Sequence, residues 1–138
     1  MKVIALRGSE NTGKSHTINI VYSLLLNDGW IQVPGHFRIL GNPKFEDMFD
    51  ILTKDDIMLG IIGMGDYQKG TGSLKVIIDE MISHRCTVVI CACRNRPAIE
   101  NAVSRFPFHH FVNKTPSTGI ANHRIVNTID AEQLITLI

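Results

Sequence analysis

The segment Gly8–Ser15, GSENTGKS, constrains this chain more than any other part of its 138 residues. It matches the pattern G-x-x-x-x-G-K-[ST] at every fixed position. The run before it, KVIALR, is apolar and β-branched as in a strand, and the apolar residues after it have helical spacing. A glycine-rich turn between a strand and a helix lets backbone N–H groups converge on an anion at the positive end of the helix. The segment therefore predicts a phosphate site, against the alternative of an ordinary turn with an N-capping serine.

The residues of this segment have distinct expected roles. Gly8 and Gly13 permit the backbone shape of the loop. We expect Lys14 to reach the β- and γ-phosphates of a nucleotide and the Ser15 hydroxyl to bind Mg²⁺. Glu10 is also a candidate general base or water-orienting group. The full set expected to contact the nucleotide is Gly8, Glu10, Asn11, Thr12, Gly13, Lys14, Ser15 and His16.

Strand-like and helix-like segments alternate along the chain, which is typical of an α/β protein with a mainly parallel sheet. The expected strands are Lys2–Arg7, Gly35–Leu40, two arms of a hairpin around TKDD with Ile57–Ile62 as the second arm, CTVVICAC and HHFVNK. The first arm also fits a helix, but TKDD is a turn signal and favours the hairpin. The expected helices are the segment that ends at Gly29, TGSLKVIIDEMISHR, RPAIENAVSRF and DAEQLITLI. TPSTGIANHR has the composition of a surface loop, and Thr128 or Asp130 is the expected cap of the last helix. We predict one domain over residues 1–138 with a sheet of about five strands. The sheet is expected to be mainly parallel, and the pattern allows one antiparallel edge strand.

With this alternation around the Gly8–Ser15 segment, the chain resembles the P-loop NTPase superfamily. The resemblance in topology covers most of the chain, although only the first loop is specific. It implies a three-layer P-loop fold, with a nucleoside triphosphate at the carboxyl ends of the strands and Mg²⁺ as its companion. ATP and GTP are both candidate ligands. The resemblance does not imply one reaction, because a fold of this kind hosts many activities.

The resemblance also implies an acidic residue that holds Mg²⁺ at the end of an apolar strand. IMLGIIGMGD ends in Asp66, which is the best candidate for this metal ligand. Asp50, Asp55 and Asp56 are weaker candidates, because they lie in the predicted hairpin and its turn. The alternative for Asp66 is an ordinary loop aspartate.

Two arginines, Arg94 and Arg96, directly follow the CTVVICAC run in CACRNRP. The carboxyl ends of parallel strands form the active edge of such a sheet, so either arginine is placed to bind a phosphate or an acidic acceptor. The alternative is a solvent-facing helix start. The candidate catalytic residues are Lys14, Asp66, Arg94 and Arg96, and the candidate metal ligands are Ser15 and Asp66.

The sequence disfavours a GTPase and favours a kinase-like protein. NKTP has Pro116 where the guanine-reading N-K-x-D motif has aspartate, and DYQK has Lys69 where D-x-x-G has glycine. Small-molecule and nucleotide kinases need only the phosphate loop, one or two carboxylates and arginines. Nucleotide kinases also carry an arginine-rich lid, whereas TPSTGIANHR contains only Arg124. We expect a small phosphotransferase. The alternative is a regulatory nucleotide-binding module or slow NTPase that signals to a protein partner through the Gly60–Gly72 loop.

The composition limits the partners and the compartment. Lys and Arg number 14 against 13 Asp and Glu, so the formal net charge is only +1. This charge is too small to attract nucleic acid or an anionic membrane. The acceptor is an unknown small molecule or protein. The three cysteines are expected to be reduced thiols, the start MKVIALRG lacks the features of a signal peptide, and no segment reaches the roughly 20 apolar residues of a membrane span. We expect a cytoplasmic protein.

Overall fold

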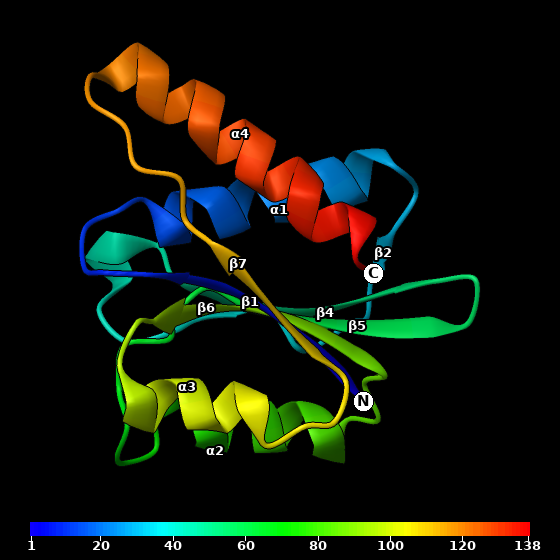
Figure 1. Cartoon of the computed structure of the whole chain (residues 1–138). Helices are drawn as coiled ribbons and strands as arrows, with labels where there is room; N and C mark the ends of the chain where they lie inside the picture. The colour runs from blue at the N-terminus through cyan, green and yellow to red at the C-terminus, as the bar shows by residue number, and fades with distance from the viewer.

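The computed structural model describes residues 1–138, which form an α/β structure with four helices and a seven-stranded mixed sheet (Figure 1). The strands are β1 (Lys2–Gly8), β2 (Ile31–Gln32), β3 (Arg38–Ile39), β4 (Met48–Lys54), β5 (Ile57–Ile62), β6 (Val88–Arg94) and β7 (His109–Asn113). The helices are α1 (Lys14–Asn27), α2 (Leu74–Ser83), α3 (Pro97–Ser104) and α4 (Ile120–Thr136), with a short 3₁₀ helix η1 (Pro43–Phe45).

The sheet has the strand order β2-β4-β5-β6-β1-β7, and β3 also pairs with β4. Strands β5, β6, β1 and β7 are parallel, whereas β4 is antiparallel to β5, and β2 and β3 are antiparallel to β4. The sheet therefore has more strands than the expected five. The one strand that runs opposite to the others, β4, lies between β2 and β5 rather than at an edge. Strand β2 was missed because two residues are too few to produce an alternating pattern in the sequence. The expected strand Gly35–Leu40 contains β3, which is shorter and covers only Arg38–Ile39.

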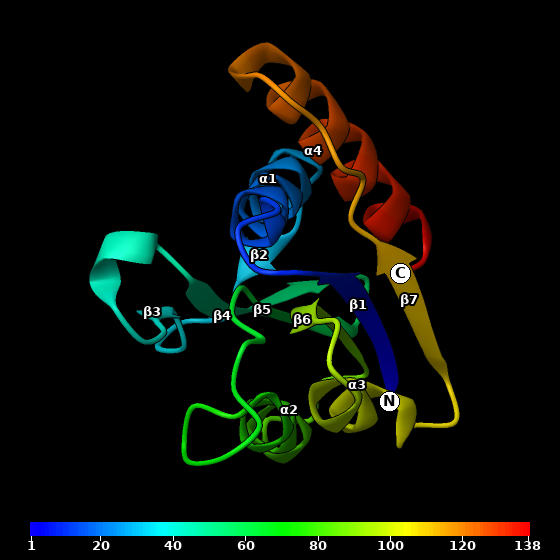
Figure 2. The ribbon, with the colours of Figure 1, turned by 60° about the vertical axis from the view of Figure 1, so that its left-hand side comes forward.

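Two helices cover each face of the sheet, as Figure 2 shows by viewing the sheet closer to edge-on. Side chains alternate between the two faces along a strand. In β1, Ile4 and Leu6 belong to the apolar core beneath α1 and α4, whereas Val3 and Ala5 belong to the core on the side of α2 and α3. None of the helices combines the length and the apolar character that crossing a membrane requires.

The β4–β5 hairpin confirms the expected reading of residues 48–62, with Ile57–Ile62 as the second arm. Asp55 and Asp56 form its turn with φ values of 51° and 66°. Positive φ at both central residues is typical of the two-residue turns whose twist matches that of the flanking strands. Both aspartates are exposed at the tip of the hairpin, where the chain reverses direction.

Helix α4 begins at Ile120, so the expected cap at Thr128 or Asp130 is wrong and the second half of the predicted TPSTGIANHR loop is helical. Gly119, with φ 84°, is the residue before the helix. The early turns of α4 expose polar and apolar residues alike and have no amphipathic pattern that a sequence could reveal. The buried stripe of α4 consists of Asn127, Asp130, Ala131 and Leu134. Packing of this stripe on α1 and the sheet holds the whole helix, including its exposed first turns.

All three cysteines are free and buried, in agreement with reduced thiols. Burial raises the pKa of Cys86 to about 11 and the pKa of Cys93 to about 12. These thiols are therefore protonated near neutral pH and are poor nucleophiles.

The register of the parallel strands brings three chain segments together at one edge of the sheet. Gly8 at the end of β1 lies opposite Arg94 at the end of β6. The Arg94 N–H donates to the Gly65 carbonyl oxygen at 2.9 Å, just beyond β5. A Cβ at Gly65 would lie 1.8 Å from the Ala92 carbonyl oxygen, so only glycine fits this close approach. The Gly8–Ser15 segment, Arg94 and the segment that leads to Asp66 thus meet at the carboxyl ends of β1, β6 and β5.

Candidate functional site

The Gly8–Ser15 segment forms a loop that leaves its amides free. None of the backbone N–H groups of residues 10–16 donates to a protein acceptor, and no side chain caps α1. Two loop residues adopt the left-handed conformation, Asn11 with φ 60° and Gly13 with φ 91°. Free N–H groups gathered ahead of a 14-residue helix provide both hydrogen-bond donors and the positive end of the helix dipole. The loop therefore has the properties of an anion-binding site.

Lys14 is folded back over this loop. Its Nζ donates to the Ser9 carbonyl oxygen at 2.7 Å, and the Thr12 hydroxyl donates to the same oxygen at 2.8 Å. Burial lowers the pKa of Lys14 from its ordinary value. The negative charge of Asp66 partly opposes this shift, and the positive charge of Arg94 adds to it. A desolvated ammonium group with only one carbonyl partner is poorly compensated. An anion in the loop would supply the missing negative charge.

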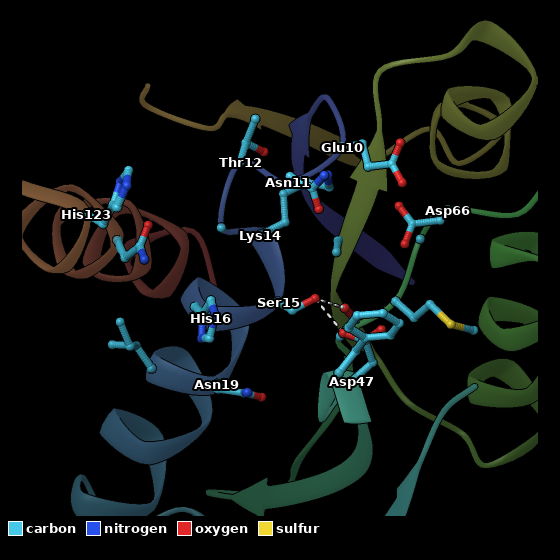
Figure 3. Close-up of a pocket in the computed structure, with 18 of the residues that line it drawn as sticks. Glu10, Asn11, Thr12, Lys14, Ser15, His16, Asn19, Asp47, Asp66 and His123 are labelled. Carbon is cyan, nitrogen blue, oxygen red and sulfur yellow. Dashed lines mark hydrogen bonds between the residues drawn. The ribbon is translucent and has the colours of Figure 1, made fainter. Parts of the chain in front are cut away.

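Ser15, the next residue, contacts an acidic residue that the sequence did not single out. Its hydroxyl donates to Asp47 Oδ1, and the Gly63 carbonyl oxygen lies 3.3 Å from the same hydroxyl oxygen. Figure 3 shows both interactions as dashed lines. Asp47 is buried and lies just before β4. Sequence reasoning missed Asp47 because the long segment between α1 and β4 gives no signal of where it folds back.

The other aspartates considered from the sequence are placed differently. Asp50 is buried, and its carboxylate accepts hydrogen bonds from the Tyr22 hydroxyl at 2.7 Å and the Gln32 amide at 3.0 Å. Asp55 and Asp56 lie in the exposed β4–β5 turn. None of these three lines the cleft described below.

Asp66 lies beside Arg94, together with Glu10 of the Gly8–Ser15 loop. Arg94 Nε is 3.4 Å from Asp66 Oδ1, and Arg94 Nη2 is 3.5 Å from Glu10 Oε1. Arg94 Nε is fully buried and makes no hydrogen bond, because the Asp66 oxygen is within ion-pair distance but poorly aligned. A buried donor without an acceptor is uncommon in folded proteins. Arg94 thus has one donor that the protein leaves unsatisfied.

Arg96 is separated from Arg94 by the structure. It is exposed at the start of α3 and does not line the cleft. The two residues were equivalent in the sequence, but the strand ends at Arg94 and the chain turns away before Arg96.

A cleft of about 1260 Å³ extends over the loop and contains most of the predicted site residues. The predicted residues that line it are Glu10, Asn11, Thr12, Gly13, Lys14, Ser15, His16, Asp66 and Arg94. Gly8 lies behind the loop, on a smaller polar cavity of about 330 Å³. The cleft also contains residues that sequence reasoning left out or placed in a surface loop: Asn42, Phe45, Asp47, Tyr67, His123 and Arg124.

The two sides of the cleft differ in what they contribute. In Figure 3, His123 of α4 lies on one side of the loop, and Asp47 and Asp66 lie on the other, with Lys14 and Ser15 between them. Asn113 and Lys114, the start of the NKTP near match, are engaged elsewhere: Asn113 Oδ1 accepts from Arg7 Nε at 3.0 Å, and Lys114 pairs with Asp130. Lys114 is buried.

The Ser15 hydroxyl, the Asp47 carboxylate and the Gly63 carbonyl are all oxygen groups, which are the ligands that Mg²⁺ prefers. No group of three or more His, Cys, Asp or Glu side chains is close enough to hold a metal ion by itself. The oxygen groups fit the way Mg²⁺ is bound with nucleotides, through one or two carboxylates together with phosphates and water.

The burial of the Asp47 carboxyl group can be tested without a nucleotide. Burial raises the pKa of Asp47 above its ordinary value of 3.8, opposed by the Ser15 hydrogen bond and reinforced by the charge of Asp66. A carboxyl group with a raised pKa contributes its stability at low pH, and the contribution is lost as the pH rises through the raised pKa. We therefore expect the free energy of unfolding of Asp47→Asn, relative to that of the unchanged protein, to be larger at pH 7 than at pH 3.5. Urea unfolding at both pH values measures this, and a stability difference that is the same at both pH values would contradict it.

Comparison of the chain with protein-family models, curated proteins and solved structures finds no match. What the cleft does is therefore inferred from its own residues and their contacts.

Proposed function

We propose that this chain is a small P-loop phosphotransferase that binds a nucleoside triphosphate, ATP or GTP, with Mg²⁺ and transfers the terminal phosphoryl group. The observation that carries the proposal is the loop of free N–H groups before α1, with the buried Lys14 folded over it. The parallel strands β5, β6, β1 and β7 and the helices on both faces also fit the P-loop NTPase fold. In this proposal the loop amides and Lys14 bind the β- and γ-phosphates.

Ser15 and Asp47 are the proposed ligands of Mg²⁺. A metal ion held there would neutralise charge on the triphosphate. Asp47 takes this role in preference to Asp66, because Asp47 contacts the Ser15 hydroxyl whereas Asp66 pairs with Arg94. Asp66 then has the role of orienting Arg94 and of receiving a proton from the acceptor.

Arg94 is the proposed stabiliser of charge on the phosphoryl group during transfer. It follows a central strand, and its backbone is fixed by the hydrogen bond to Gly65. Its Nε has no hydrogen-bond acceptor, and Glu10 and Asp66 hold the guanidinium at the cleft. A positioned arginine that meets developing charge accelerates phosphoryl transfer.

The two arginines provide a matched test of the proposal. We expect Arg94→Ala to lower the rate of NDP release by about ten- to a hundredfold, since one positioned donor to the transferred group is removed. Arg96→Ala, which alters an exposed arginine two residues away, should leave the rate within about twofold. NDP release is measured from ATP and from GTP with pooled candidate acceptors. Equal losses for the two variants would argue against a catalytic Arg94.

A second candidate function is a nucleotide-dependent regulatory module with slow or absent hydrolysis. The loop after Asp66 favours it, because Tyr67, Gln68, Lys69, Gly70 and Thr71 are all exposed while Asp66 and Tyr67 line the cleft. A ligand that contacts Asp66 could thereby alter a surface offered to a protein partner. Nucleotide binding without NDP release in any acceptor pool would favour this alternative.

A further inference from the structure

Of the four exposed aromatic side chains, two line the cleft. Phe37, Phe45, Tyr67 and Phe108 are all more than half exposed, but only Phe45 and Tyr67 belong to the cleft. Phe45 ends η1, and Tyr67 follows Asp66 in the loop after β5. Aromatic rings left open in a cleft with many polar groups are suited to stack on a planar ligand.

The side chain of Met64 brings these two segments together. Met64 is buried and lines the cleft. A Cβ at Gly41 would lie 3.1 Å from the Met64 sulfur, and a Cβ at Gly72 would lie 3.6 Å from its terminal methyl and 3.9 Å from the Tyr67 ring. The backbone ahead of η1 and the loop that carries Tyr67 therefore pack on the same thioether, which places Phe45 and Tyr67 in the same half of the cleft.

This half lies beside Asp47 and Asp66, opposite the half that α4 lines with Ile120, His123 and Arg124. The whole cleft exceeds the 300–1,000 Å³ range of common ligand pockets, so it has room for two ligands that meet at the phosphate loop. A nucleotide whose phosphates occupy the loop and whose nucleoside lies toward α4 would leave the aromatic half open.

The charges of the cleft indicate which acceptor fits this half. The cleft is lined by three permanent cations, Lys14, Arg94 and Arg124. Lys14 and Arg94 are assigned to the triphosphate, Arg94 is already paired with Glu10 and Asp66, and Arg124 is on α4. With Asp47 assigned to Mg²⁺, an acceptor in this half would face the Asp66 carboxylate and no Lys or Arg that is not already assigned, which disfavours a second phosphate or carboxylate there.

We propose that the half of the cleft lined by Phe45, Met64 and Tyr67 binds an uncharged, planar acceptor that bears a hydroxyl group, of the nucleoside class. The inference rests on the proposed function, since it names the acceptor of that same transfer. The acceptor oxygen forms a bond to the γ-phosphorus, and the bond from that phosphorus to the β–γ bridging oxygen breaks with its electron pair leaving on the nucleoside diphosphate. The hydroxyl proton passes to the Asp66 carboxylate.

Calorimetry with five nucleosides tests the proposal: adenosine, guanosine, cytidine, uridine and thymidine. Each is titrated into the free protein and into protein saturated with the β,γ-imido analogue of ATP or GTP and Mg²⁺. We expect at least one nucleoside to bind, and Phe45→Ala or Tyr67→Ala to weaken it about tenfold or more. Tyr67→Phe keeps the ring and should bind nearly as well as the unchanged protein. Phe108→Ala removes an equally exposed ring outside the cleft and should have no effect.

The outcomes separate this inference from the proposed function. If the analogue binds but no nucleoside does, or if Phe45→Ala and Phe108→Ala behave alike, the acceptor site is wrong and nucleotide binding stands. Nucleosides that bind in a Phe45-dependent manner without analogue binding would keep the site but overturn the phosphotransferase. If neither the analogue nor any nucleoside binds, both fall. Tighter binding of nucleoside monophosphates than of nucleosides, or binding of oligothymidylate alone, would overturn an uncharged small acceptor.

Discussion

Lys14→Ala should weaken nucleotide binding a hundredfold or more, which is about 2.7 kcal/mol. The reason is that Lys14 is the one cation that already lies over the loop of free amides, with its Nζ 2.7 Å from the Ser9 carbonyl oxygen. Hydrogen bonds to charged partners contribute about 1.5–3 kcal/mol each, and an ammonium group that reaches two phosphates makes more than one. Titration of ATP and GTP, each with Mg²⁺, into the unchanged protein and the variant measures the loss.

The stability of the variant separates lost binding from lost folding. The environment of Lys14 lowers its pKa, chiefly through burial, which means that the folded state disfavours the charged ammonium. Removal of this charge should therefore leave the nucleotide-free protein at least as stable as before. Lys44→Ala is the matched control, because Lys44 is exposed in η1 and lies outside the cleft. Similar nucleotide affinities for Lys14→Ala and the unchanged protein would show that Gly8–Ser15 is an ordinary turn and not a phosphate site, and would contradict the proposed function.

Asp130→Ala should lower the free energy of unfolding by about 3–5 kcal/mol, because it leaves a buried cation without its partner. Lys114 Nζ lies 2.9 Å from Asp130 Oδ2, and both side chains are almost fully buried, at 1% and 2% exposure. The Thr115 backbone N–H and hydroxyl also donate to the Asp130 carboxylate, at 2.9 and 2.6 Å. This group of contacts ties the end of β7 to the middle of α4. Urea unfolding monitored by circular dichroism measures the loss.

A surface ion pair provides the comparison for Asp130→Ala. Lys75 and Asp79 on α2 also lie 2.9 Å apart, but their side chains are 62% and 40% exposed. Lys75→Ala should cost less than about 1 kcal/mol, since water solvates the remaining charge. Burial raises the pKa of Asp130, but the hydrogen bonds from Thr115 and Lys114 outweigh it, so the net pKa is lowered. The stability from this carboxylate is therefore present above pH 3.8 and lost as the pH falls through the lowered pKa. Equal losses for Asp130→Ala and Lys75→Ala would show that burial of the Lys114–Asp130 pair is unimportant.

Much of the sheet and the Gly8–Ser15 loop could be predicted from the sequence because their signals are local. Residues adjacent in the chain form the strand, the glycine turn and the start of α1. A continuous apolar run identifies β6, and the TKDD turn between two apolar runs identifies the β4–β5 hairpin. Strand β2 gave no such signal, and the expected strand at Gly35–Leu40 is reduced to the two residues of β3. The first turns of α4 were predicted as loop, since packing further along the helix holds them in place.

The rest of the site depends on contacts between segments that are distant in the chain. Ser15 and Asp47 are 32 residues apart, and no pattern around Asp47 indicates that the chain returns there. Arg94 and Arg96 differ only in that the strand ends at the first of them. The sequence alone thus determined where the loop proposed to bind phosphate lies, because the free amides, the lysine and the helix start are consecutive residues. Only the tertiary structure decided which carboxylate, arginine and aromatic residues surround that point, because strand order and close glycine contacts set those distances.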